Sequence, residues 1–413
     1  MARSVDVAIV GAGPAGLILA VLLARAGHAV AVVEQNATFE REYRGEGIQP
    51  GTRRIFDDLG LRARIEALDH GSPRGLVGRI DGAEVRLDFR DLLGDDPAAR
   101  SLFIPQPLLL EILADAATTA GAAIAMATAF KALRYSGERV AGIDVVERGD
   151  RLESIAAALV VACDGRFSAV RRSIAAPIHL ASVPYDLLWF SARAATDAND
   201  LVYLEVNGPH LSIAFPSRRH IMQVGWLIPK GASRPPPPEL IARAPPEAAA
   251  SLETEFANSD RVTLLPIASE SIDRWWRPGL LFIGDAAHPM SPVGAQGINV
   301  AVQDAVVAAR HIAPALTEGP TIDRALAAIE RARAGSVRRI ARQQNALPAA
   351  LHRFGPGRIL RIAIGAATIA QRSGVFSMLG GPLLDRFLWG DPPIRADTGP
   401  WIDAAKDSRS KSR

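Results

Sequence analysis

Three glycines near the start of the chain could let a backbone pass close to a phosphate group. Gly11, Gly13 and Gly16 form the pattern G-x-G-x-x-G between an apolar run at 5–10 and another at 17–25. This order predicts a strand, a tight turn and a helix. The free N–H groups at the start of such a helix are suited to bind a pyrophosphate.

An acidic residue completes this unit. Glu34 closes a second predicted strand, "AVAVVE", and stands about 20 residues after the turn, where a carboxylate can accept hydrogen bonds from a ribose 2′-hydroxyl. The same charge would repel a 2′-phosphate, which argues against NADP in this site. The unit therefore predicts a dinucleotide site, and the residue types alone leave FAD and NAD open.

Two later segments place further carboxylates after predicted strands. "LVVACDGRFSAVRRSI", residues 159–174, indicates a buried strand, then Asp164 and Gly165, then an arginine-rich helix. "GDAAHPMSPVGAQGINVAVQDA", residues 284–305, begins with Asp285, passes through a loop of prolines and glycines and enters a helix near 297–299. Unpaired N–H groups at that helix start favour negative charge. An NAD-binding domain alone would need neither segment.

These motifs, in this order, resemble the class A flavoprotein monooxygenases, the para-hydroxybenzoate hydroxylase-like family. The glycine turn, the central D-G and the late G-D-A-A-H-x-x-x-P match, and "RGEGIQPGTRRIFDDLGL" at 44–61 is similar to a further element of that family. The resemblance covers roughly residues 1–345. It implies FAD as the cofactor, and by position it implies these cofactor-binding residues: Gly11, Gly13, Ala15, Gly16, Glu34, Arg44, Gln106, Asp164, Asp285, Pro292, Gly294, Gly297 and Asn299.

Several of these residues also have plainer interpretations. The resemblance places Arg44 at the FAD phosphates or ribityl chain, although it could be a solvated loop charge. Gln106 would contact the flavin or simply cap the following helix, and Asp164 would lie near the pyrophosphate or cap its own helix. Asp285 would bind the ribityl hydroxyls. We interpret His288 as a histidine that packs its loop, without a catalytic role.

One residue departs from the family pattern. The family often has P-x-x-G-Q-G-x-N after the late aspartate, and Ala295 stands here in place of the first glycine of G-Q-G. A methyl group at this position is tolerable if the residue adopts a negative φ.

The expected fold is α/β, with a discontinuous Rossmann-like FAD-binding domain. We assign to it residues 1–70, 101–177 and 277–345. Segments at 71–100 and 178–276 show the period-two alternation of strands, with a hairpin turn at Asn207-Gly208, and predict a mainly antiparallel β-sheet substrate domain. Residues 346–413 would form a C-terminal helical region that ends in a frayed polar terminus.

Composition excludes some classes of function. The net charge is only +3 and the basic residues are interleaved with acidic ones, which does not indicate a nucleic-acid surface. The single cysteine, Cys163, lies in an apolar run and should be buried and inert. No apolar run has membrane-spanning length, although weak surface contact of residues 359–376 is possible. We expect a cytoplasmic monomer or homodimer with no metal site.

The resemblance implies an enzyme that uses NADH or NADPH and O2 to hydroxylate a hydrophobic aromatic or polyketide-like molecule through a flavin C4a-hydroperoxide. Tyr203, Phe215 and Trp226 lie on the predicted sheet and are candidate walls of the substrate pocket. No residue stands out as a proton-transfer base, and Tyr203 and His210 are the side chains considered for that role.

Three alternative functions share parts of this pattern. A flavin-dependent halogenase is disfavoured because it needs an upstream lysine and the first lysine here is Lys131. A reductase of the geranylgeranyl-reductase type, or a non-catalytic FAD-binding redox protein, stays open on the sequence alone.

Overall fold

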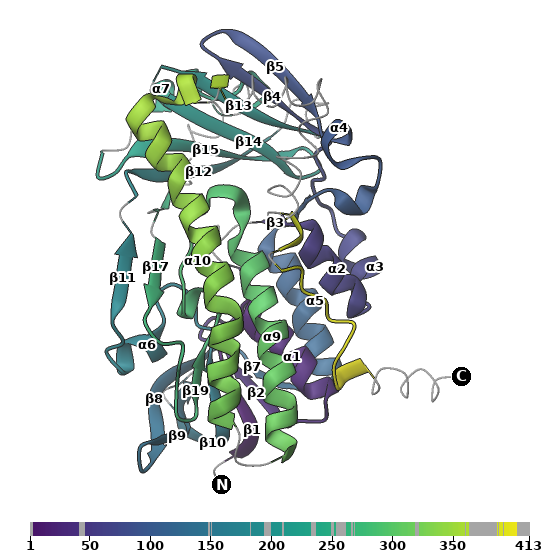
Figure 1. Ribbon diagram of the computed structural model, residues 1–413, viewed down its shortest axis with the longest axis vertical. Helices are drawn as coiled ribbons and strands as arrows, with labels where there is room; N and C mark the ends of the chain where they lie inside the picture. Colours follow the sequence, from purple (N-terminus) through teal and green to yellow (C-terminus); the bar gives the residue numbers. More distant parts are fainter. Residues whose placement is uncertain are drawn as a thin grey trace.

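The computed structural model describes residues 3–40, 46–147, 149, 151–181, 183–193, 200–208, 210–232, 237–248, 252, 262–265, 267, 269–318, 322–359, 361–362, 386, 388–390 and 392–402. The molecule is elongated, with one large sheet at each end and a layer of helices along one side (Figure 1).

An eight-stranded sheet forms the end that contains the N-terminus. Its parallel strands follow the order β19-β10-β1-β2-β7, β18 pairs antiparallel with β19, and β9 and β8 continue antiparallel from β10. The central strands are covered on both faces, which explains their continuous runs of β-branched and small apolar residues. The bounds are β1 Arg3–Val10, β2 Val30–Val33, β7 Ala123–Ala125, β8 Thr128–Ser136, β9 Arg139–Glu147, β10 Arg151–Ala162, β18 Trp276–Arg277 and β19 Leu280–Phe282.

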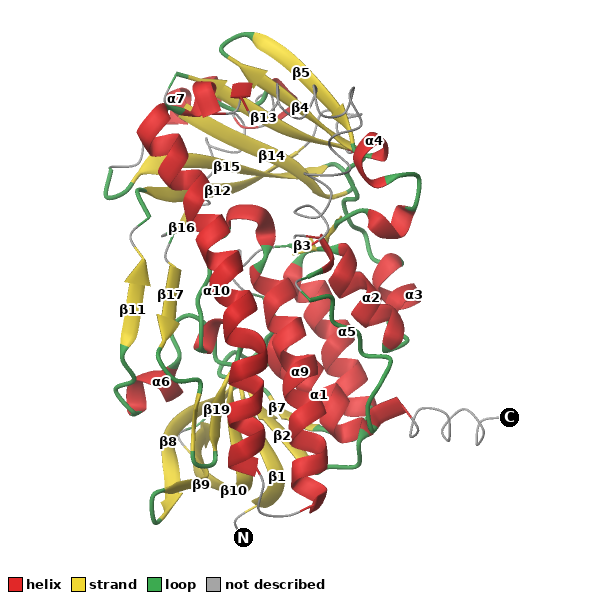
Figure 2. Ribbon diagram, viewed as in Figure 1, coloured by secondary structure: helices red, strands yellow, loops and turns green. Residues whose placement is uncertain are grey.

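Long helices cover one face of this sheet. α1 packs against α5 and α9, and α10 runs beside α9 toward the opposite end of the molecule (Figure 2). Their apolar residues, among them Leu17, Leu113 and Val302, fill the largest core. The bounds are α1 Pro14–Arg25, α5 Gln106–Thr119, α9 Gly297–Glu318 and α10 Ile322–Phe354.

A seven-stranded sheet forms the other end. Its order is β16-β12-β15-β14-β13-β4-β5, and every pair is antiparallel except β13 with β4. The predicted turn is present, because Asn207 pairs with His210 across it and Gly208 has φ +57°. The bounds are β4 Gly75–Ile80, β5 Ala83–Asp88, β12 Tyr185–Arg193, β13 Leu201–Asn207, β14 His210–Arg218, β15 Ile221–Pro229 and β16 Thr263–Leu265.

Short elements connect the two ends. The two-stranded ribbon of β11 with β17 runs along one edge, and the small pair of β3 with β6 lies between the helices and the seven-stranded sheet (Figure 1). The bounds are β3 Gly47–Ile48, β6 Leu102–Phe103, β11 Ile178–Ala181, β17 Ser269–Ile272, α2 Pro50–Asp58, α3 Arg62–Glu66, α4 Arg90–Leu93, α6 Ala169–Ser173 and α7 Pro237–Ala242. Within the described residues, 3-10 turns span Pro97–Ala99, Gly284–Ala286 and Val293–Ala295.

The C-terminal part is not a separate layer where it is described. α10 is continuous across residue 345, so one helix belongs to both sides of the predicted boundary. Residues 392–402 pack against the helical layer, with Trp401 buried in its core and Arg395 bonded to Asp58 at 2.6 Å. Among the helices of the described residues, none combines the length and apolar character needed to cross a membrane. The polar terminus and most of 359–376 lie outside the described residues.

Candidate functional site

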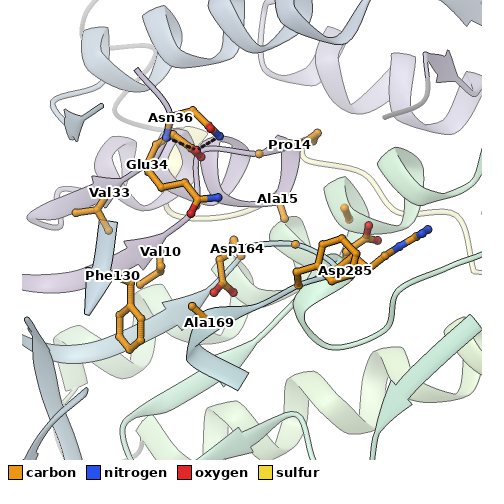
Figure 3. Close-up of a pocket in the computed structure, with 18 of the residues that line it drawn as sticks. Val10, Pro14, Ala15, Val33, Glu34, Asn36, Phe130, Asp164, Ala169 and Asp285 are labelled. Carbon is orange, nitrogen blue, oxygen red and sulfur yellow. Dashed lines mark hydrogen bonds between the residues drawn. The ribbon is translucent and has the colours of Figure 1, made fainter. Parts of the chain in front are cut away.

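A cavity of about 490 Å³ opens at the carboxyl ends of β1, β2 and β10, where the strand order of the eight-stranded sheet reverses. This is the usual place for a ligand on an open α/β sheet. Figure 3 shows that its lining comes from segments far apart in the sequence, with Pro14 and Ala15 on one side and Asp164 and Asp285 on another.

The glycine turn has the predicted geometry. Gly11 has φ +104°, and a Cβ placed there would lie 2.5 Å from the carbonyl oxygen of Cys163, so no larger residue fits. Gly13 lines the cavity and precedes α1, whose first turn has no side-chain cap. The N–H groups at the start of α1 are therefore not taken up by a capping side chain and are available to a ligand. Cys163 is buried, and burial raises the pKa of its thiol, as expected for an inert cysteine.

Glu34 is held in a fixed orientation next to this turn. Its carboxylate accepts from the backbone N–H of Ala12 at 2.9 Å and from the backbone and side-chain nitrogens of Asn36 at 3.0 and 2.6 Å. Both Glu34 and Asn36 line the cavity (Figure 3). Asn36 was not anticipated from the sequence, although its position two residues after the acidic residue is the available signal.

Asp164 lies across the cavity from Glu34 on the loop after β10. One oxygen, Oδ2, accepts from the backbone N–H of Val170 in α6, while the cap of that helix is Ser168. Within the described residues, Oδ1 is buried and has no hydrogen-bond partner. Burial raises the pKa of this carboxyl despite the hydrogen bonds from Ser168 and Val170. A buried acceptor that faces a cavity without a donor is suited to a ligand hydroxyl.

The late motif brings Asp285 and a second helix start to the same cavity. Asp285 and Gly297 both line it, and a Cβ on Gly297 would meet no atom within 4 Å. α9 begins at Gly297, as predicted. Its N-terminus adds partial positive charge to the cavity, as the N-terminus of α1 does. The loop itself contains a departure from expectation. Ala295 has φ +50°, so the condition of a negative φ is not met and the methyl group is held in a strained, left-handed conformation.

Asn299 acts within the protein rather than on the cavity. Its Nδ2 donates to the carbonyl oxygens of Ala295 and Gly47 at 2.7 and 3.1 Å, and its Oδ1 accepts from the backbone N–H of Gln49 at 2.9 Å. Asn299, Pro292 and Gly294 are not among the described residues that line the cavity. The asparagine therefore fixes the loop at 294–297 against β3.

His288 belongs to a buried ion cluster behind the late motif. Its Nε2 lies 2.6 Å from Asp304 Oδ2, and Arg333 Nε donates to Asp304 Oδ1 at 2.7 Å. Gly284 N also donates to Asp304, at 3.1 Å. Burial opposes ionisation of Asp304, but the charges of His288 and Arg333 outweigh it and the pKa of Asp304 lies below its ordinary value. The expectation of a loop-packing histidine is confirmed by these contacts; its partners, far along the chain, were not predicted.

Of the two remaining predicted cofactor contacts, one lies at the cavity. Arg44 lies outside the described residues. Gln106 lines the cavity as the first residue of α5, where no side chain caps the helix. Phe130, Arg166 and Arg172 also line the cavity and were missed. No local signal marks Phe130, because its position depends on the packing of β8 against β2 and α6, where Thr128 N donates to the carbonyl oxygen of Glu34 at 2.8 Å.

The three predicted pocket walls do not share one face of the seven-stranded sheet. Phe215 lies on the face toward β6, with its ring centroid 4.4 Å from that of Phe103. Tyr203 and Trp226 lie in the core on the opposite face, which α7 and the residues after it cover. They are therefore not placed to line a pocket with Phe215. His210 is also on the α7 side, where burial and Arg243 lower its pKa. The error has a simple cause, since alternate residues of a strand point to opposite faces.

These features fit FAD. Two helix N-termini and two arginines line the cavity and favour a negatively charged pyrophosphate. Four acidic residues also line it, and carboxylates of this kind can accept from ribose and ribityl hydroxyls: Glu34, Glu40, Asp164 and Asp285. The buried Oδ1 of Asp164, which has no hydrogen-bond partner in the part of the chain that is described, is the most direct sign that a ligand donor is expected. The fold and the cavity together define an FAD-binding protein.

Comparisons with known proteins identify the family. A family model described as "FAD binding domain" matches residues 4–344. The 6-methylpretetramide 4-monooxygenase of Streptomyces rimosus is 35% identical over 336 residues, which cover 76% of this chain and 75% of that enzyme. Rifampicin monooxygenase of Rhodococcus hoagii is 30% identical over 73% of this chain, but the match spans only 62% of that enzyme.

The solved structures agree in fold. The p-nitrophenol 4-monooxygenase PnpA of Pseudomonas putida superposes with a TM-score of 0.76 and 18% identity, covering 93% of this chain and 98% of that one. The chain therefore belongs to the class A FAD-dependent monooxygenases, and its cofactor is FAD. The reductase and non-catalytic alternatives are not favoured.

Proposed function

We propose that this monooxygenase uses a reduced nicotinamide, NADH or NADPH, and O2 to hydroxylate an aromatic, polyketide-like small molecule in the cytoplasm. The observation that carries the substrate class is a group of aromatic rings on the β6-facing side of the seven-stranded sheet. Phe215 lies 4.4 Å from Phe103 and 5.5 Å from Trp189, measured between ring centroids. The names of two relatives, which act on 6-methylpretetramide and rifampicin, support the same class.

The residues of the chain would bind and orient rather than perform the oxidation. FAD, when bound, supplies the capacity to accept a hydride and to activate O2. Glu34, Asp164 and Asp285 would hold its hydroxyl groups, and the N-termini of α1 and α9 would favour its negative charges. The aromatic rings would hold a flat substrate and exclude water from it.

The experiment is a product assay with labelled oxygen. Purified holoenzyme is incubated with NADH or NADPH, ¹⁸O2 and a panel of polycyclic phenols, and the products are analysed by mass spectrometry. We expect substrate-stimulated oxidation of one nicotinamide and incorporation of one ¹⁸O atom into the organic product. Oxidation that yields only H2O2 across the panel, or a product without label, would contradict the proposal.

The assignment of the FAD contacts can be tested separately. Asp164→Asn replaces the unpaired acceptor that we assign to an FAD hydroxyl, and loss of a hydrogen bond to a charged group typically weakens binding about 10- to 100-fold. Asp323→Asn is the matched control, because Asp323 pairs with Arg139 near the surface, away from the cavity. FAD dissociation constants are measured by flavin fluorescence. Equal constants for both variants would contradict the assignment of Asp164 as an FAD contact.

A further inference from the structure

Glu46 lies where the two ends of the molecule meet. It directly precedes β3, and its carbonyl oxygen accepts from the backbone N–H of Ile104 at 3.0 Å (Figure 1). The next residue, Gly47, packs so tightly on the loop of the late motif that a Cβ there would lie 2.6 Å from the Cβ of Ala295. Glu46 is thus fixed beside the loop that leads into α9, yet only 5% of it is exposed.

Its hydrogen-bond donors come from the seven-stranded sheet. Gln223 in β15 donates from Nε2 to Glu46 Oε1 at 2.9 Å, and its Oε1 accepts from Trp189 Nε1 at 2.8 Å and Ser191 Oγ at 3.1 Å. Because an indole nitrogen can only donate, the Trp189 contact orients the amide so that its NH2 group faces Glu46. The arrangement therefore supplies a neutral donor to one carboxyl oxygen and holds it there.

The second carboxyl oxygen of Glu46 has different surroundings. Within the described residues, Oε2 is buried and has no hydrogen-bond partner. Among the described elements around the carboxyl, β12 and β15 present neutral polar groups and β6 presents Phe103. β14 presents Ser217 and a charged group, Arg218. Burial raises the pKa of Glu46 to about 7, against the lowering effects of Ser217, Gln223 and Arg218.

The same carboxyl shares its surroundings with the aromatic rings. Phe103 pairs with Gly47 across β3 and β6, and Phe215 pairs with Gln223 across β14 and β15. Phe103, Phe215 and Trp189 are the rings that we assign to the substrate. A buried, unpaired acceptor in this setting suits a ligand that combines an aromatic ring with a hydroxyl group.

We propose that Glu46 is the residue that exchanges a proton with a hydroxylated aromatic substrate, through Oε2, the oxygen without a hydrogen-bond partner among the described residues. In this step the O–H bond of the substrate breaks, its proton bonds to Oε2, and the electron pair stays on the substrate oxygen. The ring becomes richer in electrons and more readily attacked by an electrophilic oxygen. The proton returns to the oxygen when the product leaves. This inference rests on the proposed function.

The test compares Glu46→Gln with Glu46→Asp in the holoenzyme. The wild type should lose kcat/KM as the pH falls through about 7, because protonated Glu46 cannot accept a proton. Glu46→Gln keeps the shape but cannot titrate, so it should lose about 10²- to 10⁴-fold in kcat and show no acidic limb. Glu46→Asp should restore the limb and part of the rate. A Glu46→Gln profile with the same acidic limb as the wild type would overturn the proposal.

A binding measurement does not depend on turnover. Oxidised holoenzyme without nicotinamide is titrated with 1,8-dihydroxyanthraquinone, whose absorbance reports binding. For the wild type the dissociation constant should rise as the pH falls below about 7, and for Glu46→Gln it should not change with pH. A pH-independent constant for the wild type, or no binding up to the solubility of the dye, would contradict the proposal.

Glu205→Gln is the matched control. Glu205 in β13 also has a raised pKa, caused first by burial, and its buried Oε2 has no hydrogen-bond partner among the described residues. It lies on the α7 side, where Oε2 forms an ion pair with Arg79 at 3.8 Å and Glu247 is close. We expect its profiles to equal those of the wild type. If the wild type forms no labelled product, the proposed function fails; if it does but Glu46→Gln shares its pH profile, only the role of Glu46 fails.

Discussion

Two buried carboxyl groups join distant parts of this chain, and the protein treats them in opposite ways. Asp304 receives Arg333, His288 and the N–H of Gly284, so both oxygens have donors. Glu46 receives a neutral donor, Gln223, on one oxygen and, within the described residues, no donor on the other. Accordingly the pKa of Asp304 lies below its ordinary value, whereas that of Glu46 is raised to about 7.

The difference separates a structural carboxylate from a reactive one. At Asp304 opposite charges offset the cost of burial, so the group stays ionised and holds the late motif to α9 and α10. At Glu46 the cost is not offset, so a small change in pH or a ligand donor can change its protonation. α9 connects the two regions, because it carries both Asp304 and Asn299, which fixes the segment that follows Glu46.

The largest effect should follow from removing the charge of Asp304. Asp304→Asn leaves Arg333 buried without its counter-charge, and breaking a buried ion pair costs about 3–5 kcal/mol. Urea unfolding at saturating FAD measures this loss. Asp323→Asn removes the part-exposed pair with Arg139 and should cost less than about 1 kcal/mol. Similar losses of unfolding free energy in the two variants would show that the buried cluster stabilises the fold no more than the part-exposed ion pair does.

A smaller, pH-dependent effect should follow from neutralising Glu46. A carboxyl whose pKa is raised from 4.5 to about 7 on folding favours the folded state fully at low pH and loses that contribution as the pH rises toward 7. A shift of this size corresponds to about 3 kcal/mol. Glu46→Gln has no such loss, so its stability relative to the wild type should increase by up to this amount between pH 4.5 and 8.

Urea unfolding at both pH values, again at saturating FAD, checks this expectation. The contribution of Asp304 to stability should depend on pH in the opposite direction. Because the pKa of Asp304 is lowered on folding, its contribution is present above its unfolded value and is lost as the pH falls. A stability difference between Glu46→Gln and the wild type that does not vary with pH would mean that Glu46 is already ionised in the fold.

Local sequence patterns predicted the cofactor cavity and the late motif better than the surroundings of Glu46. The glycine turn, Glu34, Asp164 and Asp285 each stand at the end of a strand or the start of a helix, where residue spacing alone indicates their position. The structure brings them to one cavity. His288 lies inside a recognisable motif, but its partners Asp304 and Arg333 come together only through the packing of α9 against α10.

The region of Glu46 could not be predicted in this way. Its contacts depend on which face of β14 and β15 points toward β3, and alternation along a strand defines two faces without saying which one faces the cofactor domain. The same ambiguity misplaced Tyr203 and Trp226, which lie with the α7 side. An isolated glutamate in "RGEGIQP" carries no local sign of burial.

The smallest effect should come from Ala295, on the loop between the two regions. A left-handed φ costs an alanine about 1–2 kcal/mol, and glycine avoids this strain but loses about 0.4–1 kcal/mol through its freer unfolded chain. Ala295→Gly should therefore stabilise the protein by less than about 1.6 kcal/mol, while Gly294→Ala, at φ +75°, should destabilise it. Ala295 packs on Gly47, and its carbonyl oxygen accepts from Asn299, so its effects should reach the flavin through the segment that holds Glu46. Three quantities test this: the flavin affinity, the flavin reduction potential and the acidic limb of the pH–rate profile. If all three stay at wild-type values, the methyl group is merely tolerated; a clear shift would mean that this strained residue tunes the flavin through the segment that holds Glu46.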